Sequence, residues 1–237
     1  GNSHAAPVLG SASAVIERNQ KPWLLIDCGQ ETLTAFETQY QNLPEAIFIT
    51  HLHMDHIGGL ERLFFKAYFN ETLRGKLKLY VPAALVPAMQ ARLADYPGVL
   101  AEGGVNWWDA FQLIPVSNGF WHDGFHLQVF PVRHHLPNSA FGLRLPGSMV
   151  WTGDTRPIPE QLEGYVGNSE LIAHDCALLG NPSHTGLADI KREYSEGLQN
   201  QLCLYHYASL DDAEQMRAQG FSVAAQMQSF ELVELNL

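Results

Sequence analysis

Short apolar segments bounded by turn residues run through almost the whole chain of 237 residues. The early segments follow one another closely, whereas the later ones are separated by stretches with a helical period. The segments predicted as strands are 12–17, 23–27, 46–50, 77–81, 125–132, 141–145, 149–152, 171–174 and 202–205. The predicted helices are 31–41, 59–68, 82–96, 185–197 and 210–219. This alternation predicts an α/β (α+β) fold in which helices flank stacked or mixed sheets.

The segment 97–124 is the least regular part of the pattern. It combines several glycines with the side chains Trp107, Trp108, Phe111, Phe120 and Trp121, which make it too aromatic for a linker. Two interpretations stay open: a hairpin rim packed on the core, or an aromatic wall that lines a substrate cleft. Neither one requires a domain boundary here, so we expect a single domain over residues 1–237.

Composition narrows the class of protein. The chain is 46% hydrophobic and 16% charged, which allows a sizeable core and excludes collagen, coiled coil and wholesale disorder. Its net charge of −11 disfavours extended nucleic acid as a partner, and no apolar run is long enough to span a membrane. Cys28, Cys176 and Cys203 are odd in number and widely spaced, which favours reduced thiols and a cytoplasmic location.

Potential metal ligands are densest directly after the apolar segment 46–50. His51, His53, Asp55 and His56 follow it within a few positions, and Gly58-Gly59 comes next. In an extended loop His51 and His53 point the same way, while Asp55 and His56 can turn toward a second point. We expect the glycine pair to allow close backbone approach and unusual dihedral angles. The pattern of this loop therefore predicts that it supplies ligands to two adjacent cations.

Further potential ligands follow three other predicted strands. The segment 125–132 is followed by His134 and His135, the segment 149–152 by Asp154, and the segment 202–205 by His206. A single histidine or aspartate at the end of a strand more often has a structural role. Four strand ends that each supply a potential ligand instead indicate a metal site, which needs ligands from more than one loop. Of the adjacent pair only one can easily face the site, and we favour His134.

The order and spacing of these residues from Gly10 to His206 resemble the metallo-β-lactamase superfamily of metallohydrolases. The resemblance implies an αββα four-layer sandwich of two sheets flanked by helices, with a two-metal site at one edge. It assigns His51, His53 and His134 to the first metal, Asp55, His56 and His206 to the second, and Asp154 to a bridge between them. It also makes Asp27 the usual acidic residue that precedes the ligand loop.

The branch of the superfamily is indicated by three features. His56 and Asp154 stand where a true β-lactamase lacks the histidine and carries a cysteine, so antibiotic hydrolysis is not expected. The stretch 27–32, Gly142 and the pair His184-Thr185 resemble ribonuclease Z and its phosphodiesterase relatives. The chain departs from ribonuclease Z in its negative charge and in lacking a basic, Gly/Pro-rich insertion of the kind that grips tRNA.

The ligand set implies a mechanism. Two cations about 3.5 to 4 Å apart share a water and lower its pKa toward about 7, which creates a metal-bridging hydroxide. Asp55 and Asp154 are expected to be catalytic as well as ligating residues. His184 is expected to donate a proton to the leaving oxygen, with a structural role at a helix start as the alternative. Asp27 and Thr50 are expected to order the ligand loop, and the pair 174–175 to have a structural or supporting role.

The function predicted from the sequence is hydrolysis of a small or short phosphodiester, including cyclic nucleotides and nucleic-acid fragments. The alternatives are a carboxylic ester, thioester or lactone hydrolase, a tRNA 3′-end processing endonuclease, and a non-hydrolytic metal-binding sensor domain. Imidazole and carboxylate ligands without thiolate suit two Zn ions and tolerate Mn or Fe. No membrane partner is expected, and a homodimer stays open as the oligomeric state.

Overall fold

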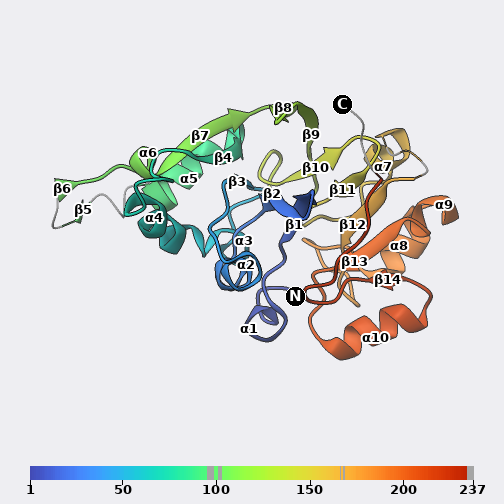
Figure 1. Cartoon of the computed structure of the whole chain (residues 1–237). Coiled ribbons are helices and arrows are strands. Elements are labelled where there is room, and N and C mark those ends of the chain that lie inside the picture. The colour runs from blue at the N-terminus through green and yellow to red at the C-terminus, as the bar shows by residue number, and fades with distance from the viewer. Residues whose placement is uncertain (95–98, 101–102, 166, 168, 234–237) are drawn as a thin grey trace. The chain divides into compact units, whose positions relative to one another are not determined.

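The computed structural model describes residues 1–94, 99–100, 103–165, 167 and 169–233. The chain forms two compact units, Gly10–Val116 and a second unit that combines Gly1–Leu9 with Ser117–Leu237. We call these the N-terminal unit and the C-terminal unit. Figure 1 shows that strands and helices are present in both. Among the described residues, no helix has the length and apolar character needed to cross a membrane.

The N-terminal unit is built on a mixed sheet with the strand order β1-β2-β3-β4-β7. Its strands are β1 (Ala14–Arg18), β2 (Lys21–Ile26), β3 (Ala46–Phe48), β4 (Leu77–Pro82) and β7 (Phe111–Val116). The strand β1 is antiparallel to β2, and the other neighbours are parallel. The carboxyl ends of β2 and β3 therefore lie at the same edge of this sheet.

Short helices and one small ribbon complete the N-terminal unit. The elements are α2 (Thr32–Tyr40), α3 (Met54–Ile57), α4 (Leu60–Tyr68), η1 (Ala83–Leu85), α5 (Val86–Met89), η2 (Gln90–Ala94), α6 (Trp107–Ala110) and the ribbon of β5 (Val99–Leu100) and β6 (Gly103–Gly104). Trp107 is fully buried, and its ring stacks on Phe64 of α4 and packs against Phe111 of β7. Part of the aromatic segment therefore belongs to the core, while Trp108 and Trp121 are exposed. Residues 97–98 and 101–102 of that segment lie outside the described residues.

The C-terminal unit is built on a sheet with the order β14-β13-β12-β11-β10-β9-β8. Its strands are β8 (Gly119–His122), β9 (Phe125–Pro131), β10 (Phe141–Leu145), β11 (Met149–Trp151), β12 (Leu171–Asp175), β13 (Leu202–Tyr205) and β14 (Ser222–Val223). Neighbours are antiparallel from β8 to β11 and parallel from β11 to β14. The strands β9, β11, β12 and β13 therefore run in one direction and end at one edge of this sheet.

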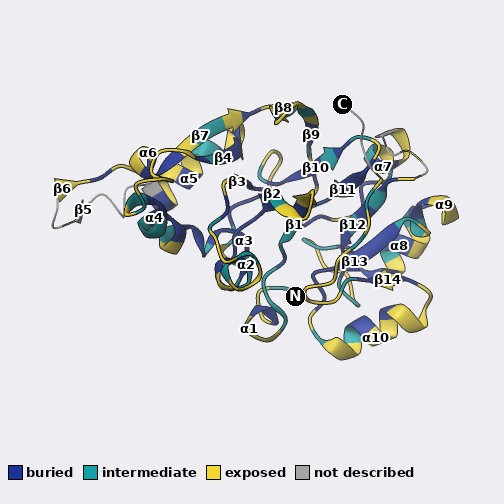
Figure 2. Cartoon of the chain, viewed as in Figure 1, coloured by how far each residue is buried: buried dark blue, intermediate teal, exposed yellow. Residues whose placement is uncertain are grey.

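Helices cover this sheet through one apolar cluster. The helices are α1 (Ala6–Leu9), α7 (Pro159–Tyr165), α8 (Leu187–Glu193), α9 (Glu196–Gln199) and α10 (Leu210–Ala218). Ile172 and Leu204 from the central strands pack in the same buried cluster as Leu162, Ile190 and Met216 from α7, α8 and α10. Figure 2 shows the buried central strands and the exposed outer side of α10. Burial of this apolar area is the main force that fixes the strands, and with them their ends.

The predicted elements match the structure in part. Every segment predicted as a strand overlaps an observed strand, but β5, β6, β7, β8 and β14 were not among the predicted strands. The helix predicted over 82–96 is instead divided into η1, α5 and η2, with Pro87 in the first turn of α5, and residues 95–96 lie outside the described residues. The helix predicted over 185–197 is divided into α8 and α9, because the Ser195 side chain caps a new helix start. The helix α3, inside the ligand loop, was not predicted.

The glycine pair after the ligand loop allows close approach without special dihedral angles. Gly58 and Gly59 have ordinary φ angles of −62° and −83°, so the expectation of unusual angles is wrong. The Gly59 amide donates a 2.9 Å hydrogen bond to the Cys28 carbonyl, and a Cβ at Gly59 would lie 2.5 Å from the Gly29 carbonyl oxygen. The glycine is therefore required by the contact between the loop after β2 and the loop after β3.

Candidate metal centre

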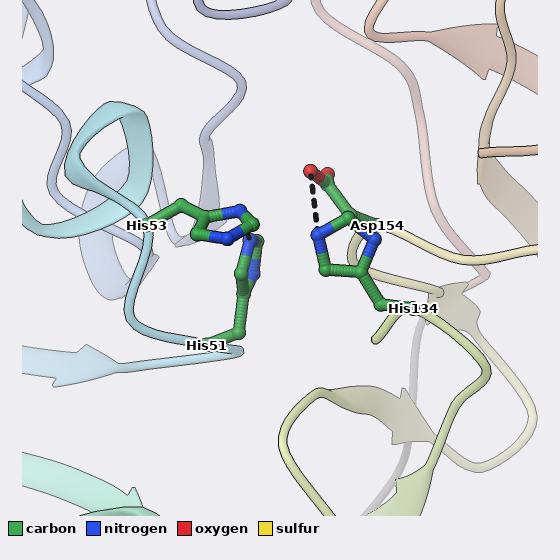
Figure 3. A group of neighbouring side chains, drawn as sticks. All are labelled: His51, His53, His134 and Asp154. Atoms are coloured by element: carbon green, nitrogen blue, oxygen red, sulfur yellow. Dashed lines mark hydrogen bonds and ion pairs between the residues drawn. The ribbon is translucent and has the colours of Figure 1, made fainter. Parts of the chain in front are cut away.

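In the N-terminal unit, the candidate ligands lie on the loop that follows β3 and on the first turn of α3. His51 is buried, and its Nε2 atom is 3.2 Å from Nδ1 of His53. The other ring nitrogen of His51, Nδ1, is 3.1 Å from the Thr50 hydroxyl. Figure 3 shows the two rings next to each other at the end of this loop. The alternation of side chains along an extended loop explains why His51 and His53 face the same way.

Asp27 fixes this loop from the end of the neighbouring strand β2. It is fully buried, and its Oδ1 atom accepts a 2.7 Å hydrogen bond from the Thr50 amide. Its Oδ2 atom accepts from the Thr50 hydroxyl at 2.6 Å and from Nδ1 of His56 at 2.8 Å. The His56 proton is thereby held on Nδ1, so that Nε2, which is 3.7 Å from Asp55 Oδ2, is the nitrogen that could bind a metal. Burial raises the pKa of Asp27, and the interactions with His56 and Thr50 oppose that rise.

In the C-terminal unit, three imidazoles surround the carboxylate of Asp154. Asp154 follows β11 and is buried. Its Oδ2 atom is 3.3 Å from Nε2 of His206, 3.9 Å from Nε2 of His134 and 4.0 Å from Nδ1 of His184. Figure 3 shows the ion pair of Asp154 with His134. The carboxylate therefore sits where one of its oxygens reaches several histidines at once.

The adjacent histidines at 134 and 135 have different environments. His134 is buried, and its Nδ1–H donates a 2.8 Å hydrogen bond to the Ser183 carbonyl, so that Nε2 faces Asp154. His135 is exposed, with Nδ1 3.3 Å from the Ser183 hydroxyl. Burial lowers the pKa of His134 to about 4, so the ring is neutral near pH 7. A neutral imidazole is the form that binds a metal.

Asp175, at the end of β12, orients two of these histidines. It is fully buried; Oδ2 accepts hydrogen bonds from His184 Nδ1 at 2.8 Å and from the Thr155 amide at 2.9 Å. Its Oδ1 atom is 3.3 Å from Nδ1 of His206. Burial opposes ionisation, but the charge of His206 and the hydrogen bonds hold the pKa of Asp175 below its usual range. The position of Asp175 at the end of a predicted strand led us to expect a structural or supporting role, but the sequence did not predict which histidines it contacts.

Two of these residues have strained backbones. Asp27 and His206 have φ angles of 59° and 70°, in the left-handed region that non-glycine residues rarely occupy. Both lie directly after a strand, where the chain must turn sharply to point the side chain at its partners. Such strain persists only where surrounding contacts fix it, and it is concentrated at functional sites.

Most of the chain matches one protein family. The family model for "Anti-Pycsar protein Apyc1" matches residues 3–230. This chain belongs to the Anti-Pycsar Apyc1 family. Among similar Anti-Pycsar proteins, the one from Paenibacillus xerothermodurans is 28% identical over 81% of this chain and 78% of its own length. The one from Saccharibacillus brassicae is 31% identical over 81% of this chain and 80% of its own length.

Solved structures show the fold of this Anti-Pycsar Apyc1 family member. The metallo-β-lactamase fold protein YhfI from Bacillus subtilis has a TM-score of 0.72 at 16% identity, over 95% of this chain and 93% of that one. A diphosphatase of the PhnP family has a TM-score of 0.68 at 17% identity, over 95% and 84%. The short form of human tRNase Z has a TM-score of 0.59 at 18% identity, over 100% and 97%. These similarities confirm the predicted metallo-β-lactamase fold.

The donor atoms in each unit fit divalent metal ions. His51, His56, His134 and His206 each have Nδ1 in contact with a supporting oxygen, while Nε2 faces another candidate ligand. A metal-binding histidine typically has this arrangement, because the partner of one nitrogen fixes the tautomer that leaves the other nitrogen available. The groups Asp27-His51-His56 and Asp154-Asp175-His184-His206 bring their ligand atoms within 4.8 Å of one another.

Gly29→Ala is expected to destabilise the N-terminal unit of this family member by roughly 2 to 3 kcal/mol. A Cβ at Gly29 would lie 2.1 Å from the Asp55 carbonyl oxygen and 2.3 Å from the Ser11 hydroxyl, so the ligand loop would have to move. Urea unfolding measures the change. Gly197→Ala is the control, because a Cβ there has nothing within 4 Å, and it should be neutral or slightly stabilising. Equal effects of the two substitutions would contradict the packing described here.

Acidification is expected to destabilise the metal-free protein partly through His134. Its pKa is lowered from 6.5 to about 4, so between these pH values the unfolded chain binds a proton at this position and the folded chain does not. The stability contributed by neutral His134 is therefore complete above about pH 6.5 and is lost as the pH falls toward 4. Asp27 has a raised pKa, so its contribution to stability increases as the pH falls, opposite to that of His134. The effect of His134 is therefore measured by comparing a His134 variant with the wild type. Urea unfolding in the presence of a chelator measures the free energy of unfolding at each pH. Between pH 6.5 and 4 this free energy should fall less in His134→Gln than in the wild type. An equal fall in both proteins would refute the role given to His134.

Proposed function

We propose that this chain hydrolyses a small phosphodiester, such as a cyclic nucleotide or a short nucleic-acid fragment, with the help of two divalent metal ions. The observation that carries the proposal is the gathering, in each unit, of buried imidazoles and carboxylates where strands end. Such groups have little packing value, since burying polar side chains costs free energy unless they are bonded. A metal site is the use that their chemistry fits.

The proposed ligand assignment follows the superfamily pattern. His51, His53 and His134 hold one ion, Asp55, His56 and His206 hold the other, and Asp154 bridges them. We also propose that residues 1–237 act as one catalytic domain, as the resemblance to the superfamily implies. Zn suits this set of imidazole and carboxylate donors, and Mn or Fe is tolerated.

The side chains of this protein supply the remaining chemistry. When bound, the ions lower the pKa of a water and polarise a phosphoryl oxygen. His184 is partly exposed and is held through Nδ1 by Asp175, which leaves Nε2 to give a proton to the leaving oxygen. Asp27 and Asp175 remain bonded to histidines, and each keeps a ring in the tautomer that the site needs.

Phosphorus rather than a carbonyl is favoured by the similar proteins. The diphosphatase and the tRNase Z with this fold are both named for cleavage at phosphorus. A net charge of −11 favours a small substrate over extended nucleic acid, whose many phosphates it would repel. The three cysteines are free and buried, which supports a reducing, cytoplasmic setting.

A substrate panel tests the proposal. Metal-replete protein is assayed on bis(p-nitrophenyl) phosphate, cyclic nucleotides and a precursor tRNA, and in parallel on carboxylic esters, thioesters and lactones. We expect turnover of the small phosphodiesters, and its loss in Asp154→Ala. Hydrolysis of lactones or thioesters with no phosphodiester turnover would overturn the proposal. Cleavage of the tRNA far more efficiently than of the small substrates would overturn the substrate size.

A further inference from the structure

The irregular segment after β4 carries an arginine that reaches the ligand loop. Arg92 lies in η2, a wide π-type turn over Gln90–Ala94 that follows α5. Turns of this kind are rare in helices and occur frequently at functional sites. The sequence pattern, which predicted one continuous helix here, gave no reason to single out this residue.

The guanidinium of Arg92 is hydrogen-bonded to the backbone between the candidate ligands His51 and His53. Its Nη1 atom donates a 2.8 Å hydrogen bond to the carbonyl oxygen of Leu52, forty residues away in the sequence. Leu52 joins His51 to His53. The Arg92 side chain is exposed, and this bond uses only one of its five N–H donors. The group is therefore held in place at the loop and, as far as the described residues show, keeps donors for a further partner.

The charge of Arg92 is unfavourable beside a cation site unless an anion lies there. A guanidinium is always protonated, and the Leu52 carbonyl is a neutral acceptor that does not cancel its charge. Two other cations of the same unit are bound differently: Arg62 and Lys66 both contact the carboxylate of Glu37. Positive charge next to ligands for divalent ions raises the free energy of the site without substrate. An anion bound at the site lowers it.

We propose that Arg92 binds a phosphoryl oxygen of the substrate beside the His51–His53 pair. The inference deepens the proposed function and rests on it, because it names the residue that recognises the phosphate. The fork of a guanidinium matches two oxygens of a phosphate, which a lysine ammonium does not. Arg92 thus determines affinity for the anionic group, and the metal ligands do not depend on it.

Arg92→Gln and Arg92→Lys test this inference, with Arg62→Gln as the matched control for loss of an exposed arginine in the same unit. For Arg92→Gln we expect KM for bis(p-nitrophenyl) phosphate to rise by about 10- to 100-fold, the effect of losing a charged hydrogen bond, with kcat changed less than about threefold. The dissociation constant of inorganic phosphate, measured by calorimetry on the metal-loaded protein, should rise by a similar factor. Arg92→Lys should be intermediate, and Arg62→Gln should match the wild type.

The variants separate anion binding from a purely structural role. Glutamine can still donate a hydrogen bond to the Leu52 carbonyl, so a structural role would be rescued in Arg92→Gln. Wild-type KM and wild-type phosphate affinity in that variant would therefore overturn the inference while the proposed function stands. If the wild type hydrolyses no phosphodiester, the proposed function fails, and the phosphate calorimetry still decides the role of Arg92. Elemental analysis checks that each variant keeps its metal.

Discussion

Asp154→Asn is expected to lower kcat/KM for bis(p-nitrophenyl) phosphate by on the order of 10³-fold or more. The Asp154 carboxylate has one oxygen within 3.3 to 4.0 Å of three imidazoles, and it is the proposed bridge between the ions. An amide has the same shape but no charge, and its nitrogen cannot bind a cation. The substitution therefore removes the negative charge and one of the two oxygens that could bind the ions, without opening a cavity. Steady-state kinetics and elemental analysis of the same preparation measure the loss of activity and of metal together.

Asp123→Asn is the matched control for this substitution. Asp123 lies in the same unit and also faces an imidazole, with Oδ2 3.7 Å from His122 Nε2, but its side chain is about half exposed. The same change of charge should leave activity and metal content as in the wild type. A fully active Asp154→Asn, or an equal loss in both variants, would show that Asp154 is not a metal ligand.

Asp175→Asn is expected to weaken metal binding by about 10- to 100-fold and to lower kcat/KM by at least as much. The carboxylate accepts from His184 and from the Thr155 amide and lies beside His206, so an amide can satisfy only some of these donors. His206 then loses the partner that fixes its tautomer, and the proposed proton donor His184 loses its orientation. Competition with a chelator of known affinity measures the metal affinity, and initial rates measure kcat/KM.

Glu170→Gln separates this effect from simple loss of a buried carboxylate. Glu170 is buried in the same unit and is bonded to Arg144 at 2.6 Å, and no candidate metal group found among the described residues contains it. The variant should lose stability but keep its metal affinity. If Asp175→Asn only lowers stability, as Glu170→Gln does, the role given to Asp175 is wrong.

Much of the fold could be predicted from the sequence, because each strand is marked by a pattern of neighbouring residues. Strands such as β3 and β13 are short apolar runs that end at a polar ligand, and this contrast is visible in the sequence alone. The helices were harder, since a side chain such as that of Ser195 or a ring such as that of Pro87 can divide a segment that looks periodic. The short helix α3 has too few residues to show a period at all.

The hydrogen bonds that support the candidate ligands were harder to predict from the sequence, because they join residues that are far apart along the chain. The pattern points to Asp27 as an acid after a strand, but its contacts with Thr50 and His56 depend on the parallel pairing of β2 and β3. Asp175 and Arg92 illustrate the same limit. Each has a contact that only the three-dimensional arrangement identifies, Asp175 with His184 and Arg92 with the carbonyl oxygen of Leu52.

The central claim is that the imidazoles and carboxylates of this chain hold two metal ions. The most direct measurement is the metal content of protein purified without chelator, by elemental analysis against protein concentration from amino-acid analysis. We predict two divalent ions per chain, with Zn as the main metal. A preparation of folded protein with one ion or none, which gains no second ion when titrated with Zn, Mn or Fe, would contradict the account.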